Sequence, residues 1–347
     1  MKRFLLYGCA LMLSGCLYSQ GLPNTAFPSL NLSSSARLAS LGGNFATFPE
    51  PDINFAISNP SLILPSLDHF AMLHYADYFW AYSNLHAAYV RDLQKVGVFL
   101  ASMQYVNYGS IEAYDASGYY LGPSNPMYEF ALNLGWGKAL VDSVFSIGAN
   151  FKYLFFRGEN FFQHGVAVDV SGTYTNVEKR LGVSLGFRNI GTVLKRDLVT
   201  DYEKLPFEIT MAVYQRIQHA PFAYSVVLSN LQRWNLSGVD VNAEEVDPVT
   251  GEVTKPNKFS TFADNAMRHI IPGAEVFLFG NFALRLSYNY HRRQELKNSV
   301  RPGFVGFSWG VGAKIYKFQI DYARSTYNLA GAPNYITVSA NLMDFFK

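Results

Sequence analysis

The sequence predicts an all-β protein, a 14-stranded antiparallel transmembrane β-barrel that follows an N-terminal hatch or plug segment. Three observations predict this fold. The composition combines 16% aromatic and 16% charged residues with a mean hydropathy of only +0.04. From about residue 67 onward, large apolar residues alternate with small or polar ones, and the connections between the alternating segments are short and long in turn. Strands with one face in lipid and the other in water account for all three observations.

The charge balance argues against a nucleic-acid-binding protein. The 28 Lys and Arg residues include Lys2 and Arg3, so residues 21–347 hold 26 basic residues against 26 acidic ones. No basic stripe marks the chain. After the N-terminus, no apolar run reaches the roughly 18 residues that a membrane-spanning helix needs. The composition therefore excludes a helical membrane protein and favours membrane-spanning strands.

Residues 1–20 form a predicted signal peptide. Two basic residues precede an apolar stretch from Phe4 to Leu17, which is the order of a secretory signal. Two processing routes stay open. One is cleavage near Ser19–Gln20, and the other is lipidation of Cys16 at the lipoprotein-like box Leu13-Ser14-Gly15-Cys16. Because Cys9 and Cys16 are the only cysteines, residues 21–347 offer no disulfide and no cysteine ligand.

Residues 21–66 break the alternating pattern and form the predicted hatch. Ser33 to Leu41 favours a short helix that a double glycine ends. Asp52 is placed to cap a second short helix, Ile53 to Ser58, which an Asn-Pro pair stops. The pattern leaves open whether this segment is a plug within the barrel or an arm at its periplasmic mouth. The candidate hatch residues are Gly42, Gly43, Asp52, Asn59 and Pro60.

Residues 67–347 are the predicted outer-membrane barrel and contain fourteen alternating segments. In Phe145 to Phe155 the odd positions are apolar, and small or polar residues interleave. A two-residue period is that of a strand with different surroundings on its two faces. The predicted strands are 68–79, 81–91, 95–107, 127–138, 143–157, 160–175, 181–190, 207–218, 221–235, 267–279, 281–293, 303–315, 317–327 and 334–346.

Connection lengths sort the predicted strand ends into two sides. Turns after even-numbered strands are short, such as Ile315–Lys317, while several loops after odd-numbered strands are long, such as Tyr108–Pro126 and Trp234–Ala266. Outer-membrane barrels have short periplasmic turns and longer extracellular loops. An even number of strands then places both the N-terminus and the C-terminus in the periplasm.

Several strings of residues resemble known outer-membrane families. Leu41-Gly-Gly43, Asp52 and Asn59-Pro60-Ser61-Leu62 are similar to the N-terminal hatch of the FadL-type barrels, which have fourteen strands. A second set of strings, in its order and spacing, resembles the PorQ barrels of the type IX secretion system of Bacteroidota, within the wider PorV/FadL-like family. These strings are His219–Phe222, Ser229–Trp234, Phe262–His269, Arg292–Glu295 and Gly306–Gly312.

The two resemblances imply different functions. Similarity to the PorQ barrels implies a non-enzymatic barrel in the outer membrane of a Gram-negative, Bacteroidota-type bacterium, in the complex that attaches secreted cargo to the cell surface. The implied partners are a PorZ-like surface protein, PorU-like and PorV-like components of the same complex, and lipopolysaccharide. Similarity to the FadL-type barrels implies the alternative, a transporter of hydrophobic or small solutes across the outer membrane.

The predicted inner face of the barrel carries charges that either line a solute path or lock the N-terminal segment through ion pairs. No histidine spacing typical of a zinc enzyme and no G-x-S-x-G motif occurs. We therefore expect no enzyme activity, no cofactor and no metal site. The candidate inner-face residues are Glu129, Lys152, Asp169, Arg188, Arg285, His291, Lys314 and Asp321.

The longest loop, Asn235–Asp264, is the predicted partner-binding surface, because loops on a rigid barrel are where binding usually takes place. It carries acidic pairs and a lysine. The candidate loop residues are Asp240, Glu244, Glu245, Asp247 and Lys255.

Overall fold

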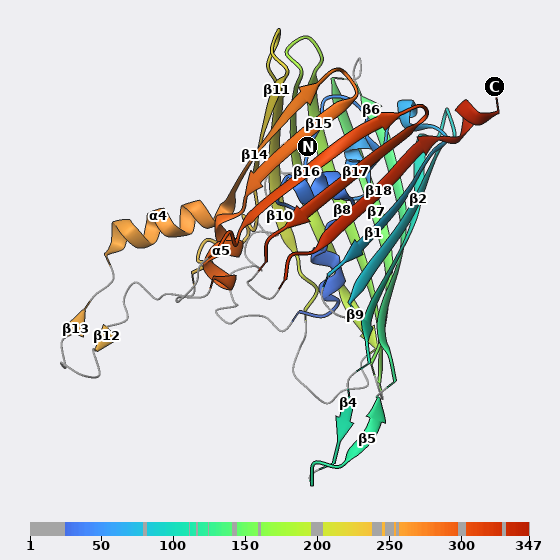
Figure 1. Cartoon of the computed structure of the whole chain (residues 1–347). Coiled ribbons are helices and arrows are strands. Elements are labelled where there is room, and N and C mark those ends of the chain that lie inside the picture. Colours follow the sequence, from blue (N-terminus) through green and yellow to red (C-terminus); the bar gives the residue numbers. More distant parts are fainter. Residues whose placement is uncertain are drawn as a thin grey trace, which may run out of the picture.

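The structure is a computed structural model that describes residues 25–78, 82–110, 112–115, 117–123, 125–140, 144–158, 161–195, 204–237, 245–246, 253–254, 257–297, 303–327 and 331–346. The predicted signal peptide lies outside the described residues. Fourteen strands form a closed antiparallel barrel (Figure 1). The ring closes where β1 pairs with β18, with Phe70 opposite Asn341 and Asp77 opposite Asn334. The predicted 14-stranded antiparallel barrel is confirmed.

The barrel strands follow chain order around the ring. They are β1 (Phe70–Asp77), β2 (Ser83–Asp92), β3 (Val98–Gly109), β6 (Met127–Leu140), β7 (Phe145–Arg157), β8 (Phe162–Asn176), β9 (Leu181–Lys195), β10 (Glu208–Arg216), β11 (Phe222–Leu228), β14 (Ile270–Leu278), β15 (Phe282–Tyr288), β16 (Phe307–Ile315), β17 (Phe318–Ser325) and β18 (Asn334–Asn341).

The two ends of the barrel differ. The short turns, such as those between β2 and β3 and between β14 and β15, lie at one end, which we call the short-turn end (Figure 1). The opposite, long-loop end carries the hairpin β4 (Glu112–Tyr114) and β5 (Tyr120–Pro123), the hairpin β12 (Glu245–Val246) and β13 (Val253–Thr254), and the helices α4 (Lys258–His269) and α5 (Tyr290–Leu296).

Several predicted strands are too long at their ends, and asparagine side chains that cap helices explain three of these differences. Predicted strand 281–293 ends at Tyr288, because the Asn289 side chain accepts a hydrogen bond from the N–H of Arg292 at 2.8 Å and starts α5. Asn257 caps α4 in the same way, and α4 takes the first residues of predicted strand 267–279. Predicted strand 221–235 ends at Leu228, and Asn230 follows in a turn with φ of 56°.

The last predicted strand, 334–346, also ends early. It stops at Asn341, whose side chain accepts a hydrogen bond from the N–H of Met343 at 2.9 Å. The 3-10 helix η5 (Leu342–Phe345) follows, so the aromatic C-terminal residues do not extend β18.

The outer wall of the barrel is apolar and carries aromatic side chains near both ends. On β7, Phe145 lies at the short-turn end beside Tyr174, with ring centroids 5.2 Å apart. Ten residues further, Phe155 lies at the long-loop end beside Tyr128, at 6.1 Å. A rise of about 3.3 Å per residue and a strand tilt of roughly 40° separate these two bands by roughly 25 Å. That spacing matches the apolar band of a barrel in an outer membrane. Among the described residues, no helix combines the length and the apolar character that crossing a membrane requires.

Residues 25–67, which we call the N-terminal segment, lie inside the barrel (Figure 1). They contain η1 (Pro28–Asn31), α2 (Ala36–Ser40), α3 (Ile53–Ala56), η2 (Pro60–Leu62) and η3 (Pro65–Leu67). Helix α2 contacts β15 to β18, and η2 contacts β6 to β8 on another part of the wall. The helix predicted over Ser33–Leu41 starts later, at Ala36, because the Ser35 side chain caps α2. The Asp52 side chain caps α3, as predicted.

Glycines on the inner wall make room for this segment. A Cβ added at Gly148 of β7 would lie 2.2 Å from the carbonyl oxygen of Pro60, and one at Gly137 of β6 would lie 2.2 Å from that of Ile63. Both neighbours are backbone atoms, which cannot rotate away. The backbone of η2 can therefore approach the wall only because these two wall residues have no side chain.

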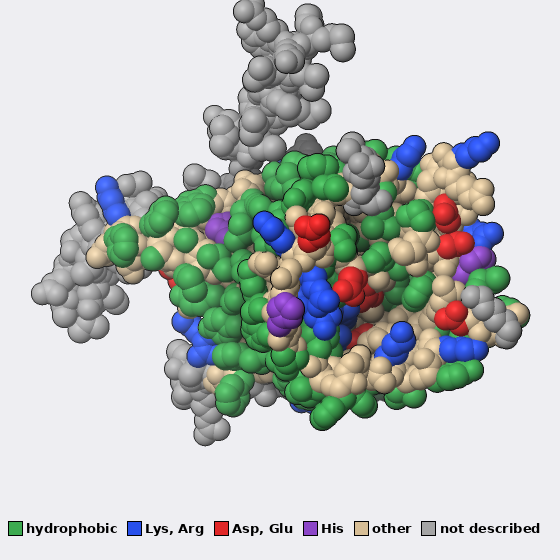
Figure 2. Space-filling view, turned by 90° about the horizontal axis from the view of Figure 1, so that it is seen from above, with side chains coloured by type: hydrophobic (Ala, Val, Ile, Leu, Met, Phe, Trp, Pro, Cys, Tyr) green, Lys and Arg blue, Asp and Glu red, His purple; other side chains and the backbone are tan. Residues whose placement is uncertain are grey.

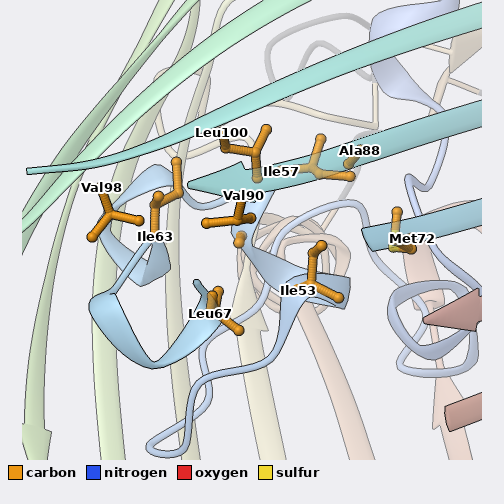
Figure 3. Packing of buried hydrophobic residues seen from close by; sticks show 10 residues of the cluster. Ile53, Ile57, Ile63, Leu67, Met72, Ala88, Val90, Val98 and Leu100 are labelled. Atoms are coloured by element: carbon orange, nitrogen blue, oxygen red, sulfur yellow. The ribbon is translucent and has the colours of Figure 1, made fainter. Parts of the chain in front are cut away.

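An apolar cluster joins the segment to the first three strands (Figure 3). The segment contributes residues from α3 to η3, and the wall contributes inward residues of β1, β2 and β3. The cluster consists of Ile53, Ala56, Ile57, Ile63, Leu67, Met72, Ala88, Val90, Val98 and Leu100. This part of the inner wall is apolar because it packs against protein rather than water.

Candidate functional site: the barrel interior

Charged side chains from distant parts of the chain meet inside the barrel. Arg37 of α2 donates to the Glu275 carboxylate of β14 through Nε and Nη2, at 3.1 and 2.9 Å, and also pairs with Asp52. Arg285 of β15 donates to Glu275 at 2.5 Å and to Asp321 of β17 at 2.6 Å. Seen from the short-turn end, charged side chains gather near the centre of the face, with hydrophobic ones to the left of them and along the lower edge (Figure 2). The network ties the N-terminal segment to three strands.

The surroundings of Arg37 keep it charged. Its guanidinium carbon lies 4.2 Å from the ring centroid of Phe48 and 5.0 Å from that of Phe55. Burial by itself would lower the pKa of Arg37, but the Glu275 and Asp52 carboxylates outweigh burial and raise that pKa well above its ordinary value. The side chain is therefore a permanent cation at the contact between segment and wall.

A second network links strands to one another. Lys152 of β7 lies 2.6 Å from the Asp169 carboxylate of β8 and donates to the Asn189 side chain at 2.9 Å. Arg188 of β9 pairs with Glu208 of β10 at 2.9 Å. Each cation of this network thus pairs with an acid on the neighbouring strand.

Six of the eight predicted inner-face residues are buried within the barrel. Lys314 is exposed at the short-turn mouth, because β16 ends one residue later. His291 belongs to α5 at the long-loop end and not to a strand. The six buried residues are Glu129, Lys152, Asp169, Arg188, Arg285 and Asp321.

Sequence reasoning missed the residues that complete the networks. Glu275 is fully buried and binds both arginines, and Tyr214 donates a hydrogen bond to it at 2.7 Å. Arg37 had a signal in the sequence, since it is the only charged residue from 21 to 49. A lone charge in an apolar, small-residue helix indicates a buried ion pair.

The predicted hatch residues hold the turns of the N-terminal segment. Asp52 accepts a hydrogen bond from the N–H of Asn54 at 2.8 Å. Asn59 donates to the carbonyl of Ala46 and to the Ser184 hydroxyl of β9, both at 3.0 Å. The Gly43 carbonyl accepts from Ser33 at 3.0 Å.

Gly42 and Pro60 touch the wall through their backbones. Gly42 has φ of 79°, and its added Cβ would lie 2.7 Å from the Ser287 hydroxyl. Its carbonyl accepts a hydrogen bond from the Asn289 side chain at 3.1 Å. Pro60 presents its carbonyl to Gly148, as described above.

Three cavities of 250 Å³ or more lie around the N-terminal segment within the described part of the chain. One of about 500 Å³ opens at the short-turn mouth and is strongly charged, with Arg37, Asp52 and Lys314 in its lining. One of about 400 Å³ at the long-loop end is polar and reaches His291 and Arg292 of α5. A third, of about 250 Å³, also lies at the long-loop end.

The third cavity, which we call the apolar cavity, differs from the others in its lining. Its walls come from the N-terminal segment, from the strands β3, β6, β7 and β8, and from the β7–β8 connection, and hydrophobic side chains dominate. It is lined by Thr25, Ala26, Phe27, Pro28, Tyr108, Met127, Glu129, Phe156, Phe161 and Gln163. Glu129 is only 2% exposed and is the one carboxylate in this lining.

Helices α4 and α5 form a pair at the long-loop end of the barrel. Arg268 of α4 pairs with Asp264 at 2.7 Å and with Glu295 of α5 at 2.8 Å. Partial burial would raise the pKa of Asp264, but hydrogen bonds from Arg268 and Tyr290 outweigh burial and lower it. Burial lowers the pKa of His291 on α5. Figure 1 shows α4 extending sideways from the barrel wall.

The opposite face of α4 is apolar and exposed. Phe259 is 79% exposed and Phe262 is 57% exposed, and Trp234 packs on Phe262 with ring centroids 5.1 Å apart. Sequence reasoning treated this region as loop and strand, although its apolar residues recur at helical spacing. Of the predicted loop residues, Asp240, Glu244, Asp247 and Lys255 lie outside the described residues, and Glu245 belongs to β12. No group of three or more His, Cys, Asp or Glu side chains suited to a metal occurs in the described part of the chain.

A scan against protein-family models and a search of curated proteins gave no match. The fold, however, is similar to solved structures. The Pseudomonas putida toluene transporter TodX aligns with a TM-score of 0.51 and 13% identity over 90% of this chain and 99% of that one. The chain has the FadL-like outer-membrane barrel fold.

Two further structures with this FadL-like fold are similar to the chain. The Ralstonia pickettii toluene transporter TbuX aligns with a TM-score of 0.49 and 11% identity, over 90% of this chain and 98% of that one. A Pseudomonas aeruginosa FadL homologue aligns with 0.49 and 9% identity, over 89% and 98%.

Proposed function

We propose that this FadL-like barrel is a passage for small hydrophobic solutes across the outer membrane of a Gram-negative bacterium, and that the N-terminal segment is its plug. The apolar cavity carries the proposal. A cavity walled by Phe27, Phe156 and Phe161 at the long-loop end suits an apolar solute and not an ion. The toluene transport named for TodX supports the same solute class.

Under this proposal the long-loop end faces the outside and both termini face the periplasm. A solute enters the apolar cavity first and meets the N-terminal segment there, because Phe27 and Pro28 of that segment form part of the wall. The Arg37–Glu275 contact holds the segment in place. Passage therefore requires that the segment shifts, and the resting barrel passes few ions.

Filling the apolar cavity tests this function. Met127→Trp places a bulky ring in the cavity, while Leu134→Trp places the same ring on the outer face of the same strand, where Leu134 is 63% exposed. Uptake of radiolabelled toluene is measured in cells with an intact outer membrane that express equal amounts of each barrel. We expect Met127→Trp to lower uptake by about tenfold, because overpacking costs 1–3 kcal/mol, and Leu134→Trp to leave it unchanged. Equal uptake by both variants contradicts the proposal.

A second candidate is a docking barrel of a PorQ-like attachment complex, with a PorZ-like surface partner. The exposed apolar face of α4 favours it, since Phe259, Phe262 and Trp234 form a large aromatic surface at the long-loop end. Co-purification with the partner from detergent-solubilised membranes tests it. Phe259→Ser with Phe262→Ser should abolish recovery of the partner, whereas Thr261→Ser on the same helix should preserve it. A barrel that always isolates alone argues against this candidate.

A further inference from the structure

Glu129, which lines the apolar cavity, differs from every other buried acid of the described barrel. Glu275 and Asp321 pair with arginines, Asp169 pairs with Lys152, and Glu208 pairs with Arg188. Among the described residues, Glu129 forms no ion pair. Its Oε1 accepts a hydrogen bond from the Tyr108 hydroxyl at 2.6 Å, and its Oε2 accepts one from the N–H of Ser29 at 3.3 Å.

These contacts still leave acceptor capacity on Glu129. A carboxylate offers about four lone-pair sites, and the Tyr108 hydroxyl together with the N–H and hydroxyl of Ser29 fill at most three of them. A buried acceptor in apolar surroundings gains from every further donor, because nothing else there can replace water. The free sites belong to a residue that lines the apolar cavity. A ligand that brings one neutral O–H donor therefore completes the site.

Aromatic rings surround this acceptor and continue along the inner wall. Tyr108 stacks on Tyr82 with ring centroids 5.1 Å apart, and Tyr82 stacks on Tyr78 at 4.6 Å. On its other side, Tyr108 meets Phe156 edge-on at 6.1 Å, and Phe156 lies 5.5 Å from Phe161. Rings in this arrangement pack well against another flat ring.

The size of the cavity fits a single ring. An apolar cavity of about 150 Å³ is large enough to hold benzene, and this cavity has about 250 Å³. A ring with one or two small substituents therefore fits, while a long acyl chain extends beyond it.

We propose that the apolar cavity is a binding site for small neutral phenols. The ring lies among Phe27, Phe156 and Phe161, and the phenolic hydroxyl donates a hydrogen bond to the Glu129 carboxylate. This inference rests on the proposed function and narrows its substrate class from hydrophobic solutes to hydroxylated aromatics. A hydrocarbon of the same size fills the cavity but brings no further hydrogen-bond donor to Glu129. An aromatic carboxylate is excluded, because it would bring a charge into an apolar cavity whose lining offers no cation.

Fluorine NMR of the full barrel in lipid nanodiscs tests the site. The probes are 4-fluorophenol, fluorobenzene and 4-fluorobenzoate, and empty nanodiscs give the partition into lipid that is subtracted. We expect 4-fluorophenol to bind about 10- to 100-fold more tightly than fluorobenzene, because a site with an unfilled buried acceptor favours the ligand that supplies a hydrogen-bond donor. We expect 4-fluorobenzoate not to bind.

Variants of Glu129 separate the hydrogen bond from the cavity. In Glu129→Leu the preference for 4-fluorophenol should disappear while fluorobenzene still binds, which also shows that the cavity is intact. In Glu129→Gln an amide oxygen still accepts, so 4-fluorophenol binding should persist, and 4-fluorobenzoate should still not bind, because the lining of the cavity offers its charge no cation. The control Asp77→Asn changes an exposed acid at the long-loop end of β1, and it should bind the three probes as the wild type does.

The outcomes distinguish this inference from the function on which it rests. Equal binding of 4-fluorophenol and fluorobenzene to the wild type overturns the phenol site and leaves the passage for hydrophobic solutes standing. The same holds if Glu129→Leu keeps the wild-type preference. If none of the three probes binds above the nanodisc background, both the phenol site and the apolar cavity as an entry point are overturned.

Discussion

Removing the charge of Arg37 should release the N-terminal segment from the wall. In Arg37→Met, the segment loses both hydrogen bonds to Glu275, its pair with Asp52 and the contacts with the rings of Phe48 and Phe55. Breaking a buried ion pair by removing one partner costs about 3–5 kcal/mol. The lower end applies here, because Glu275 keeps Arg285 and the Tyr214 hydroxyl as partners.

A loss of about 3 kcal/mol shifts the ratio of released to bound segment by roughly 150-fold, since each 1.4 kcal/mol is a factor of ten. Current through single barrels in a planar bilayer measures this ratio as the fraction of time spent conducting. We expect the wild type to be almost silent and Arg37→Met to conduct for roughly 100-fold more of the time. Arg37→Lys keeps the charge but loses the two-pronged contact with Glu275, so it should fall between them.

Lys152→Met is the matched control. It removes an equally buried cation from the lumen, but the partners of Lys152 are Asp169 and Asn189 on the wall. If Lys152→Met conducts as much as Arg37→Met, loss of lumen charge explains the current and release of the segment does not. If Arg37→Met stays as silent as the wild type, the pairing with Glu275 does not hold the segment.

Three further predictions concern packing and pH. Gly148→Ala should destabilise the contact between η2 and the wall by about 1–3 kcal/mol, because the new Cβ meets the Pro60 carbonyl at 2.2 Å. The control Gly172→Ala should be neutral, because its Cβ meets nothing closer than 3.8 Å. Amide hydrogen exchange of residues 61–63 reads this out, and equal protection in both variants contradicts it. Asp52→Ala should raise exchange in α3 by removing the cap on Asn54, an effect of about 1 kcal/mol, while Glu50→Ala nearby should not. The α4–α5 pair should loosen as pH falls, because the pKa values of His291 and Asp264 are lowered in the paired state and the detached state therefore binds protons more readily. The stability of the pair is fully present at neutral pH. It is lost in two steps, first below the ordinary imidazole range and then below the ordinary carboxylate range. Fluorescence of Trp234, which packs on Phe262 and His269, follows this transition, and a signal constant from pH 7 to the carboxylate range would refute it.

Much of the wall could be predicted because its signal is local. On β7, outward apolar residues and inward Ser146, Gly148, Asn150 and Lys152 alternate as the strand passes between two surroundings, and the alternation is visible without any neighbour. The caps were local as well, since Asp52 and the Asn59-Pro60 stop act within a few residues. Where asparagines begin helices at residues 257, 289 and 341, alternation alone extended the strands too far.

The interior could not be predicted in the same way. Arg37 and Glu275 are 238 residues apart in the chain, and no local pattern pairs them. Glu129 looked like one of several similar inner-face charges, yet it has no cation among the described residues while the other acids do. Its distinct position depends on which strands flank β6 and on where the N-terminal segment places Phe27.

The sequence by itself determined the number of strands, which face of each strand is apolar, and which ends carry the short turns, because a lipid face and an inner face impose their period on every strand separately. Only the tertiary structure decided which inward charges pair, which glycines admit the backbone of η2, and where an apolar cavity with an unpaired carboxylate remains. Those features depend on the register that closes β1 against β18 and on the course of residues 25–67 through the lumen, and both are set by contacts between residues far apart in the chain.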